Sequence, residues 1–550
     1  VPMGRRIAAA LDGELDVVLV RKLGAPGMPE FAIGAVDESG WTWLADHARL
    51  AGADDAYVAR ESAAQREVMR RRRARYTPVR PPIDPAGRVA IVVDDGLATG
   101  ATMLAALHAV RARGPRWLIC AVPVASREAL ALVRPRSTED VSALLRLCSA
   151  HRIAVVPQGG LTGLAGAAVP TQGAVAVSME RLNSIEDINT RTGLMQVQAG
   201  VTLQSVQEAA VNAGMVFGVD LGARGSCQIG GNVATNAGGN GVLQHGMMRE
   251  QVLGLEVVLA DGTVLPMLRP MLKNNTGYDL KQFFIGSEGT LGIVTRVLLR
   301  LRPAPQATAT TLVAMPDFDS ALAVLKRMQS RFGNSVAAYE LMWDSFVQAS
   351  MAWLKLAAPF EQRYPLLALI NVDGKDEAQL QGDVQQVLEE AMEAGEVLDA
   401  IVAQSVAQVQ QLWKLREAPA ELNNNMHPAI NFDVSLPQAD IGRFAQACMQ
   451  AFAARWPAHQ ALYFGHVGDG NLHVSVDGKT VNGECEQVEE LLYRIVGEMQ
   501  GSVSAEHGIG LHKKPYLSNS RTPAELAAMR AIKLALDPLG LMNPGKVFDL

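Results

Sequence analysis

The sequence predicts a multidomain protein that combines the α/β and α+β fold classes. Its 550 residues are 49% hydrophobic and 19% charged, which is enough apolar material for three or four separate cores. Short strands alternate with helices, and three glycine-rich runs lie between strands in the middle of the chain. We expect four parts, with the boundaries 1–126, 127–303, 304–515 and 516–550.

Composition argues against several classes of protein. A formal charge of −6 and a pI near 6.0 disfavour a nucleic-acid partner, which requires a basic surface. The basic run Met69–Arg75 follows two glutamates and is expected to be a solvated helix face. Five scattered cysteines without a CxxC pair favour a reducing compartment. No apolar run reaches the roughly 18 to 20 residues of a membrane span, and no signal peptide is visible, so we expect a cytoplasmic protein.

The first part contains a phosphate-binding pattern. Residues 16–20 predict a buried strand that leads into a basic, glycine-containing turn at 21–27. Residues 89–93 predict a second buried strand, followed by two aspartates and a loop of small and hydroxylic residues that opens a helix at 103–113. Such a loop suits a phosphate, and paired carboxylates suit ribose hydroxyls or a metal. The residues of this motif are Asp94, Asp95, Thr99, Gly100 and Thr102.

The two segments resemble the pyrophosphate loop and the PRPP-binding motif of type I phosphoribosyltransferases, and the resemblance covers residues 1 to about 125. The first core strand of that family would precede Val1, and its usual continuation after Val124 is absent. A working transferase and an inherited fold without turnover are therefore both open, as are a gene fusion and a truncated reading frame.

The second part is organised around three glycine-rich runs. Ser137–Asp140 predicts a capping box that opens a helix to about His151, and residues 153–156 predict a strand. The runs that follow are 157–166, 222–240 and 274–294. The second run has no apolar stripe, so we expect it to contain no helix. Backbone amides without Cβ atoms suit a phosphate-bearing ligand, but no run matches the Rossmann pattern.

These runs, with a hairpin predicted at Asp261-Gly262, resemble the FAD-linked oxidoreductases of the vanillyl-alcohol oxidase and p-cresol methylhydroxylase type. The resemblance runs from Val133 to Leu550 and lies in the branch of the D-lactate and D-2-hydroxyglutarate dehydrogenases. It implies that the runs wrap FAD, and no histidine or cysteine stands at an obvious tethering position, so noncovalent FAD is expected. The residues implied to bind FAD are Pro157, Gly159, Gly160, Thr162, Gly163, Leu164, Gly222, Ser226, Gly230, Gly231, Asn232, Thr235, Asn236, Gly238, Gly239, Glu288, Gly292, Ile293 and Asn543.

The third part predicts a ferredoxin-like α+β cap. Its pattern is a strand at 311–315, a helix at 318–332, a strand at 366–372 and a helix at 377–394. The C-terminal segment resembles the closing segment of the family, which returns to the FAD-binding domain.

Metal-type ligands gather late in the chain. His466 and His473 flank a tight glycine turn, so a hairpin would bring both imidazoles to one point, and Glu506 adds a carboxylate. Two histidines and one carboxylate suit Zn²⁺ or a similar divalent ion with an open position. The spacing alone favours structural histidines, whereas the family resemblance, in which matching residues bind metal, favours a metal site. The resemblance also implies that His507 is the catalytic base and Arg416 the clamp for the substrate carboxylate.

The resemblance implies an FAD-dependent dehydrogenase that oxidises a D-2-hydroxy acid to the 2-oxo acid and passes electrons to an unidentified acceptor, with a homodimer as one possible assembly. The alternatives are a phosphoribosyltransferase or bifunctional fusion, and a non-catalytic protein that binds FAD and a nucleotide. Family members that oxidise D-2-hydroxyglutarate carry a lysine where this chain has Asn431, and Ser475 is expected in the same pocket. We therefore expect D-lactate or a longer monocarboxylic acid to be preferred.

Overall fold

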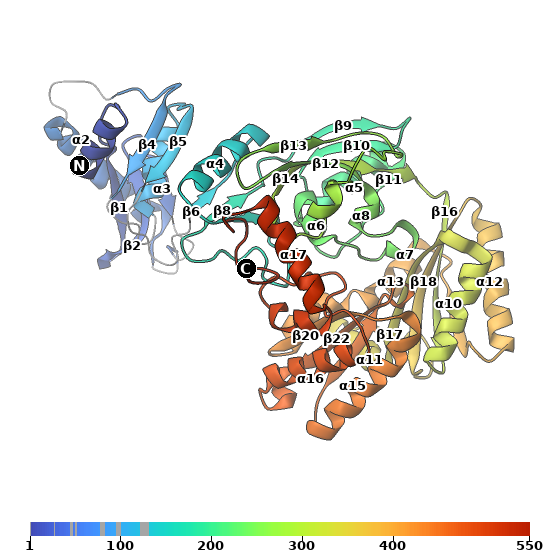
Figure 1. Cartoon of the computed structure of the whole chain (residues 1–550). Helices are drawn as coiled ribbons and strands as arrows, with labels where there is room; N and C mark the ends of the chain where they lie inside the picture. Colours follow the sequence, from blue (N-terminus) through green and yellow to red (C-terminus); the bar gives the residue numbers. More distant parts are fainter. Residues whose placement is uncertain are drawn as a thin grey trace. The chain divides into compact units, whose positions relative to one another are not determined.

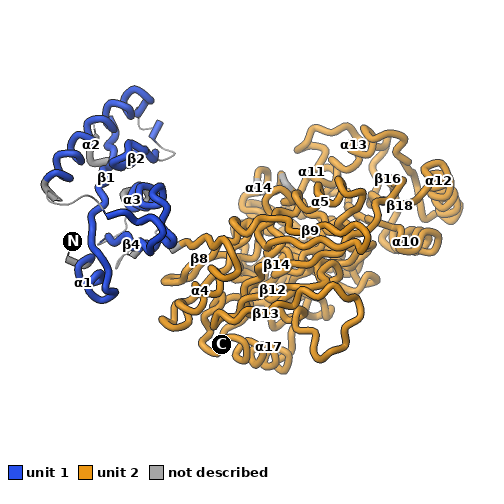
Figure 2. Tube along the Cα trace, turned by 90° about the horizontal axis from the view of Figure 1, so that it is seen from above, with its two compact units in different colours: residues 1–131 blue, residues 132–550 orange. Residues whose placement is uncertain are grey.

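The computed structural model describes residues 2–26, 28–44, 48–49, 52–76, 83–94, 101–121 and 131–550. The chain divides into two compact units, residues 1–131 and 132–550, which Figure 2 shows in different colours. Among the described helices, none has the length and hydropathy needed to cross a membrane.

The described residues of the first unit form two small sheets. β1 (Val20–Ala25), β2 (Met28–Asp37) and β3 (Thr42–Leu44) form an antiparallel sheet, and β4 (Val89–Val93) pairs in parallel with β5 (Trp117–Ala121). The helices in the described part of this unit are α1 (Pro2–Ala10), α2 (Asp55–Tyr76) and α3 (Ala101–Arg111).

In this unit the strand predicted at 89–93 and the helix predicted from Met103 form as β4 and α3. The expected burial of that strand is wrong, because Val89 is exposed and the rest of β4 is half-buried. The strand predicted at 16–20 is wrong, because β1 begins at Val20 and occupies most of the predicted turn. Its antiparallel pairing with β2 supplies the backbone partners there, and Leu23 and Ala25 are buried. Of the predicted phosphate-binding loop, Asp94 directly follows β4. Asp95, Thr99, Gly100 and the side chain of Thr102 lie outside the described residues.

The second unit begins with the half that holds the glycine-rich runs. Its main sheet is antiparallel, in the order β13 (Val264–Met267), β12 (Val252–Val258), β14 (Ile293–Arg300), β10 (Leu194–Gln198), β9 (Ile185–Asn189). A smaller sheet has the order β6 (Ala131–Val133), β8 (Val175–Ser178), β7 (Val155–Gln158), and β11 (Met215–Val216) pairs with β15 (Arg302–Pro303). The helices are α4 (Thr138–Ala150), α5 (Leu203–Asn212), α6 (Ile229–Thr235), α7 (Val242–His245), α8 (Met248–Gln251) and α9 (Lys281–Phe284).

Local signals in this half are mostly confirmed. The predicted hairpin joins β12 to β13, with Gly262 at a φ of 84°. α4 starts as predicted, because the Ser137 hydroxyl accepts the amide of Asp140. Only half of the capping box forms, since the Asp140 carboxylate accepts the amide of Arg136 instead of that of Ser137.

The second glycine-rich run does contain a helix, contrary to the prediction. α6 spans Ile229–Thr235 and buries Ile229, Asn232 and Val233. Isoleucine and valine four residues apart lie on one helical face, and packing of that face into the core outweighs the low helix propensity of the glycines.

The cap is a seven-stranded antiparallel sheet, seen beside the glycine-rich half in Figure 1. Its order is β19 (Asp399–Val402), β16 (Ala307–Met315), β18 (Leu366–Gly374), β17 (Val336–Trp343), β21 (Ala461–Gly465), β22 (Asn471–Asp477), β20 (Ala429–Ser435). With α10 (Phe318–Phe332) and α12 (Glu377–Glu393), strands β16 to β19 form a βαββαβ series in the order 4-1-3-2, the ferredoxin-like arrangement that was predicted. β20, α15 (Ile441–Arg455), β21, β22 and α16 (Cys485–Glu498) repeat this series without its last strand.

The two faces of the cap sheet differ. α10, α12, α15 and α16 bury apolar side chains against one face, whereas α11 (Asp344–Leu354) and α13 (Val406–Arg416) pack on the other. α14 (Leu422–Asn425) follows α13, and α17 (Pro523–Leu536) precedes the C-terminal segment. Strand residues alternate between the faces. Phe432 and Val434 point to the four-helix face, so Asp433 between them points to the other.

Candidate functional site

The three glycine-rich runs pack together. A Cβ at Gly160 in the first run would lie 1.9 Å from the carbonyl oxygen of Ser226 in the second, so this approach requires glycine. The third run bonds to the end of α6, where the amide of Gly286 donates to Val233 O (3.0 Å) and that of Glu288 to Ala234 O (2.8 Å). Segments separated by more than a hundred residues therefore build one surface of backbone.

Part of this surface faces open space. A Cβ at Gly163, Gly222 or Gly231 would meet no heavy atom within 4 Å. Gln228 Oε1 is buried and has no hydrogen-bond partner among the described residues. It lies 3.7 Å from a Cβ built on Gly159, whose other near neighbour is Gly231. Open glycines with an unpartnered buried acceptor fit a ligand that brings its own donors and approaches the backbone closely.

Other residues predicted to bind FAD contact the protein itself. The Glu288 carboxylate accepts the amides of Ile509 (2.7 Å) and Gly510 (2.8 Å). Burial raises the pKa of Glu288 more than these amides lower it. The Asn543 side chain donates to the carbonyls of Glu288 (2.7 Å) and Ala167 (3.1 Å). Glu288 thus binds the third run to residues 509–510, and Asn543 binds the C-terminal segment to the same run.

Several further predicted residues lie in close internal packing. Cβ atoms at Gly230, Gly238 and Gly292 would lie 2.7, 2.6 and 2.8 Å from Ala199, Val242 and Val257, respectively. Ile293 is buried. Polar groups of the second run also have internal partners: Asn232 donates to Cys227 Sγ, Thr235 donates to Gly231 O and Asn236 accepts the amide of Arg249. Packing therefore accounts for the glycine content of much of this run.

The predicted metal-type ligands converge. His466 follows β21 and His473 lies on β22, and the hairpin between them turns at Gly470 with a φ of 91°. One ligand atom from each of His466, His473 and Glu506 lies within 4.8 Å of the other two. The cluster touches the second glycine-rich run directly, because the amide of Gly239 donates to Glu506 Oε1 at 3.0 Å.

A buried glutamate that sequence reasoning missed lies beneath this cluster. Glu340 on β17 accepts hydrogen bonds from His466 Nδ1 (2.6 Å) and Arg416 Nε (2.8 Å). Burial alone would raise the pKa of Glu340, but the charges of His466 and Arg416 lower it to about 2. Burial likewise opposes protonation of His466, yet Glu340 raises the pKa of His466 to about 9. An acidic residue inside an otherwise apolar strand was the signal available in the sequence.

A second buried carboxylate, that of Asp433, binds the segment that carries Glu506 and His507. Asp433 Oδ2 accepts the amides of Glu506 (3.0 Å) and His507 (2.9 Å) and the ammonium of Lys513 (3.2 Å). Burial would raise the pKa of Asp433, but Lys513 and His507 hold that pKa well below its usual value. His507 Nδ1 lies 3.6 Å from the same oxygen. Asp433 thus fixes the backbone that carries both Glu506 and His507.

The remaining predicted residues lie on the same sheet face. The Arg416 guanidinium lies 5.0 Å from the ring centre of Phe464, which stacks on His473 at 5.1 Å. Burial lowers the pKa of His473 well below its usual value, which favours the neutral imidazole that a metal requires. Asn431 and Ser475 are paired across β20 and β22, and the Ser475 hydroxyl donates to Asn431 Oδ1 at 2.8 Å.

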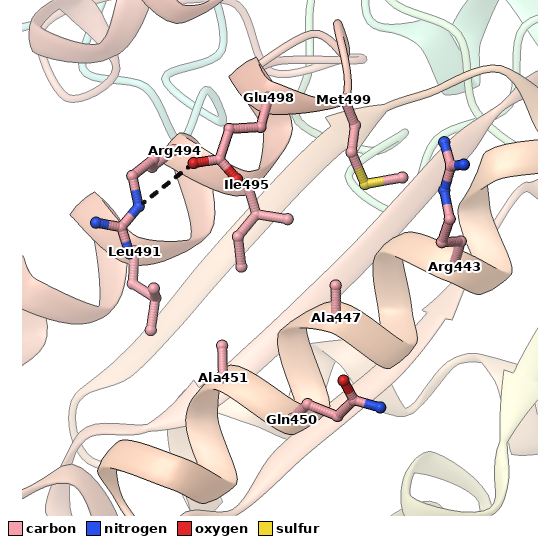
Figure 3. A pocket seen from close by; sticks show the side chains of 9 residues that line it. All are labelled: Arg443, Ala447, Gln450, Ala451, Leu491, Arg494, Ile495, Glu498 and Met499. Atoms are coloured by element: carbon pink, nitrogen blue, oxygen red, sulfur yellow. Dashed lines mark ion pairs between the residues drawn. The ribbon is translucent and has the colours of Figure 1, made fainter.

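A hollow elsewhere on the cap holds none of these residues. Figure 3 shows it between α15 and α16. Its volume is about 690 Å³. Its charged residues have partners, since Arg494 pairs with Glu498 and Arg443 with Asp440. The chemistry is therefore concentrated on the opposite face of the cap sheet.

Three protein families match successive parts of the chain. Residues 1–141 match a phosphoribosyl transferase domain, residues 129–267 an FAD binding domain, and residues 304–547 the C-terminal domain of FAD linked oxidases. The last two matches cover the cap and the part of the glycine-rich half that holds its first two runs, so FAD is the ligand that fits the open backbone surface.

Similar curated proteins cover most of the second unit. A D-2-hydroxyglutarate dehydrogenase of Xanthomonas citri pv. viticola is 41% identical over 426 residues, covering 76% of this chain and 89% of the relative. That of Stutzerimonas stutzeri is 38% identical over 424 residues, with 76% and 90% covered. The mitochondrial enzyme of Rattus norvegicus is 38% identical over 417 residues, with 76% and 77% covered.

Solved structures share the fold at low sequence identity. p-Cresol methylhydroxylase with substrate bound superposes with a TM-score of 0.62 at 16% identity, covering 76% of this chain and 88% of that one. An alkyldihydroxyacetonephosphate synthase gives 0.59 at 18% identity, with 75% and 76% covered. Fold, family matches and relatives agree, and the chain belongs to the FAD-linked oxidase family that includes the D-2-hydroxyglutarate dehydrogenases.

Proposed function

We propose that the chain is an FAD-dependent dehydrogenase that oxidises a D-2-hydroxy acid to the 2-oxo acid. The observation that carries this proposal is the hydrogen bond between Gly239 N and Glu506 Oε1, at 3.0 Å. It brings the polar cluster of the cap to the edge of the glycine-rich surface, where a bound cofactor and a substrate would meet. FAD, held noncovalently, would supply the hydride acceptor, and a separate electron acceptor would be needed to complete the reaction.

Arg416 binds the C1 carboxylate of the substrate in this proposal. Its Nε is engaged by Glu340, and its two terminal amino groups have no hydrogen-bond partner among the described residues. A planar guanidinium with two free donors suits bidentate recognition of a carboxylate. The cation–π contact with Phe464 holds the group in place.

His507 takes the proton of the 2-hydroxyl. Its Nδ1 faces Asp433, so the proton is accepted at Nε2, and the Asp433 carboxylate stabilises the resulting imidazolium. The His507 side chain is 28% exposed, which leaves it accessible to a substrate. Its own backbone amide is bonded to the same carboxylate, so the position of the base is fixed at two points.

His466, His473 and Glu506 would hold a divalent ion such as Zn²⁺. The donor set and its spacing fit, and the hydrogen bond from His466 Nδ1 to Glu340 is the outer contact typical of metal-bound histidine. Glu340 raises the pKa of His466, so a metal ion at Nε2 would compete with a proton there. The ion would supply Lewis acidity at the 2-hydroxyl oxygen.

For the far end of the substrate we propose an uncharged group. Asn431 and Ser475 pair with each other, and the nearby described ammonium of Lys513 is bonded to Asp433. A lysine at this position would give a second substrate carboxylate a charge-assisted bond worth roughly 1.5 to 3 kcal/mol, and Asn431 does not provide it. This favours a monocarboxylic D-2-hydroxy acid, although the relatives are named for D-2-hydroxyglutarate.

The test is the visible spectrum of the purified protein. D-Lactate, D-2-hydroxybutyrate and D-2-hydroxyglutarate are each added without oxygen, with L-lactate as the control. Bleaching of the oxidised flavin by D-acids alone is the expected result. A fully loaded flavin that no D-2-hydroxy acid bleaches would show that the chain binds FAD without this activity.

A further inference from the structure

Glu340 is a buried charge in the middle of the cap sheet. Its side chain is 1% exposed, and its neighbours on β17 are apolar. A buried carboxylate is retained only where partners offset its desolvation. Both of its partners are proposed site residues.

The two oxygens of Glu340 have separate tasks. Oε2 accepts Arg416 Nε and Oε1 accepts His466 Nδ1. The bond to Arg416 engages Nε and leaves the terminal amino groups of the guanidinium unoccupied by any described residue. The bond to His466 engages Nδ1 and leaves Nε2 for the metal-type cluster, where it lies 4.0 Å from Glu506 Oε1. One carboxylate thus orients the proposed substrate clamp and one proposed metal ligand.

Strand pairing fixes this arrangement. β17 and β21 are antiparallel, with Leu341 opposite Gly465 and Met342 opposite Phe464, so Glu340 lies opposite His466 as the register continues. Arg416 is the last residue of α13, which covers the same sheet face. The Glu340 side chain is 1% exposed, so it acts on the site through Arg416 and His466.

We infer that Glu340 is a positioning residue that sets substrate-carboxylate binding and metal affinity together. It keeps the Nδ1–H tautomer of His466, so that Nε2 presents its lone pair, and it fixes the rotation of the Arg416 guanidinium. The inference rests on the proposed function, because it assigns roles to Arg416 and His466.

A matched control exists in the other half of the unit. Glu256 on β12 is also buried and also pairs with an arginine, Arg296, at 2.8 Å. Its further partners are the hydroxyls of Thr138 and Thr295. None of these residues belongs to the proposed site, so Glu256→Gln removes a similar buried charge without touching it.

The experiment compares wild type, Glu340→Gln, Glu340→Asp and Glu256→Gln, each loaded with FAD. Zn²⁺ dissociation constants come from equilibrium dialysis, and kcat and KM from the D-2-hydroxy acid that the wild type oxidises fastest. Glu340→Gln is expected to weaken Zn²⁺ binding about 10- to 100-fold and to raise KM, with FAD content unchanged. Glu340→Asp keeps the charge, but its side chain is too short to reach both partners. This variant is therefore expected to keep either the Zn²⁺ affinity or the KM of the wild type, and not both. Glu256→Gln should change the melting temperature alone.

A folded Glu340→Gln protein whose Zn²⁺ affinity and KM match the wild type overturns the inference. If this variant does not fold, Glu340→Asp decides in its place, and wild-type values for both properties overturn the inference equally. A wild type that binds no Zn²⁺ and oxidises no 2-hydroxy acid overturns the proposed function and the inference with it. If the wild type binds Zn²⁺ and oxidises a 2-hydroxy acid, and the Glu340 variant has the same Zn²⁺ affinity and KM, the inference is overturned while the proposed function stands.

Discussion

The glycine-rich half and the cap build their parts of the proposed site in opposite ways. The glycine-rich half uses backbone: Gly160 packs on a carbonyl, and Gly163 and Gly231 face open space. The cap uses side chains held by two buried carboxylates, Glu340 and Asp433. Backbone surfaces suit close approach by a large cofactor, whereas chemistry at one carbon requires titratable groups at fixed positions. Substitutions in the glycine-rich half should therefore weaken cofactor binding, whereas substitutions in the cap should lower turnover.

The largest expected effect is loss of the metal-type cluster. His473→Ala and treatment with a chelator should each abolish flavin reduction by the substrate while FAD remains bound, because the backbone surface is untouched. Anaerobic stopped-flow absorbance measures the reduction, and the bound flavin is quantified after denaturation. Full activity in a protein shown to be metal-free would rule out a metal in this role.

Loss of the proposed base should lower activity less than loss of the metal-type cluster. His507→Ala is expected to lower kcat about 10²- to 10⁴-fold, the range typical of a general base, with FAD content unchanged. His459, which bonds to the carbonyl of Trp456 and lies outside the site, provides the control variant His459→Ala. An equal loss in both variants would indicate that folding, not proton transfer, is affected.

Substitutions in the glycine-rich backbone surface should weaken FAD binding and leave the catalytic groups of the cap in place. Gly163→Leu should weaken FAD binding without lowering the melting temperature of the FAD-free protein, since its side chain enters open space. Gly382→Leu is the matched control, because Gly382 is also exposed and unobstructed but lies on α12 in the cap. Fluorescence titration with FAD measures both. Unchanged affinity in Gly163→Leu would place the cofactor elsewhere.

The smallest expected effect concerns the substrate's far end. Asn431→Lys should shift the ratio of kcat/KM values toward D-2-hydroxyglutarate over D-lactate by about one to two powers of ten. Initial rates with a dye acceptor on both proteins measure the ratio. A tenfold preference of the wild type for D-2-hydroxyglutarate would contradict the placement of Asn431.

Much of the fold followed from local patterns. The helices at 318–332 and near 377–394 and the hairpin at Asp261-Gly262 form as predicted, because periodicity, capping and turn residues act over a few residues. The strand at 16–20 and the helix-free run at 222–240 were wrong, because pairing with β2 and burial of Ile229 and Val233 are tertiary effects.

The sequence by itself indicated the residue types of the proposed site, and alternation along β20 shows how a strand sorts side chains between two faces. Asn431 and Asp433 alternate with Phe432 and Val434, and this period of two separates a polar face from an apolar one. Only the tertiary structure decided which groups meet. Glu340 lies 76 residues from Arg416 and 126 from His466, and it reaches both because β17 pairs with β21 beneath α13. A buried charge draws its partners from whatever the fold brings near, and sequence spacing does not record that proximity.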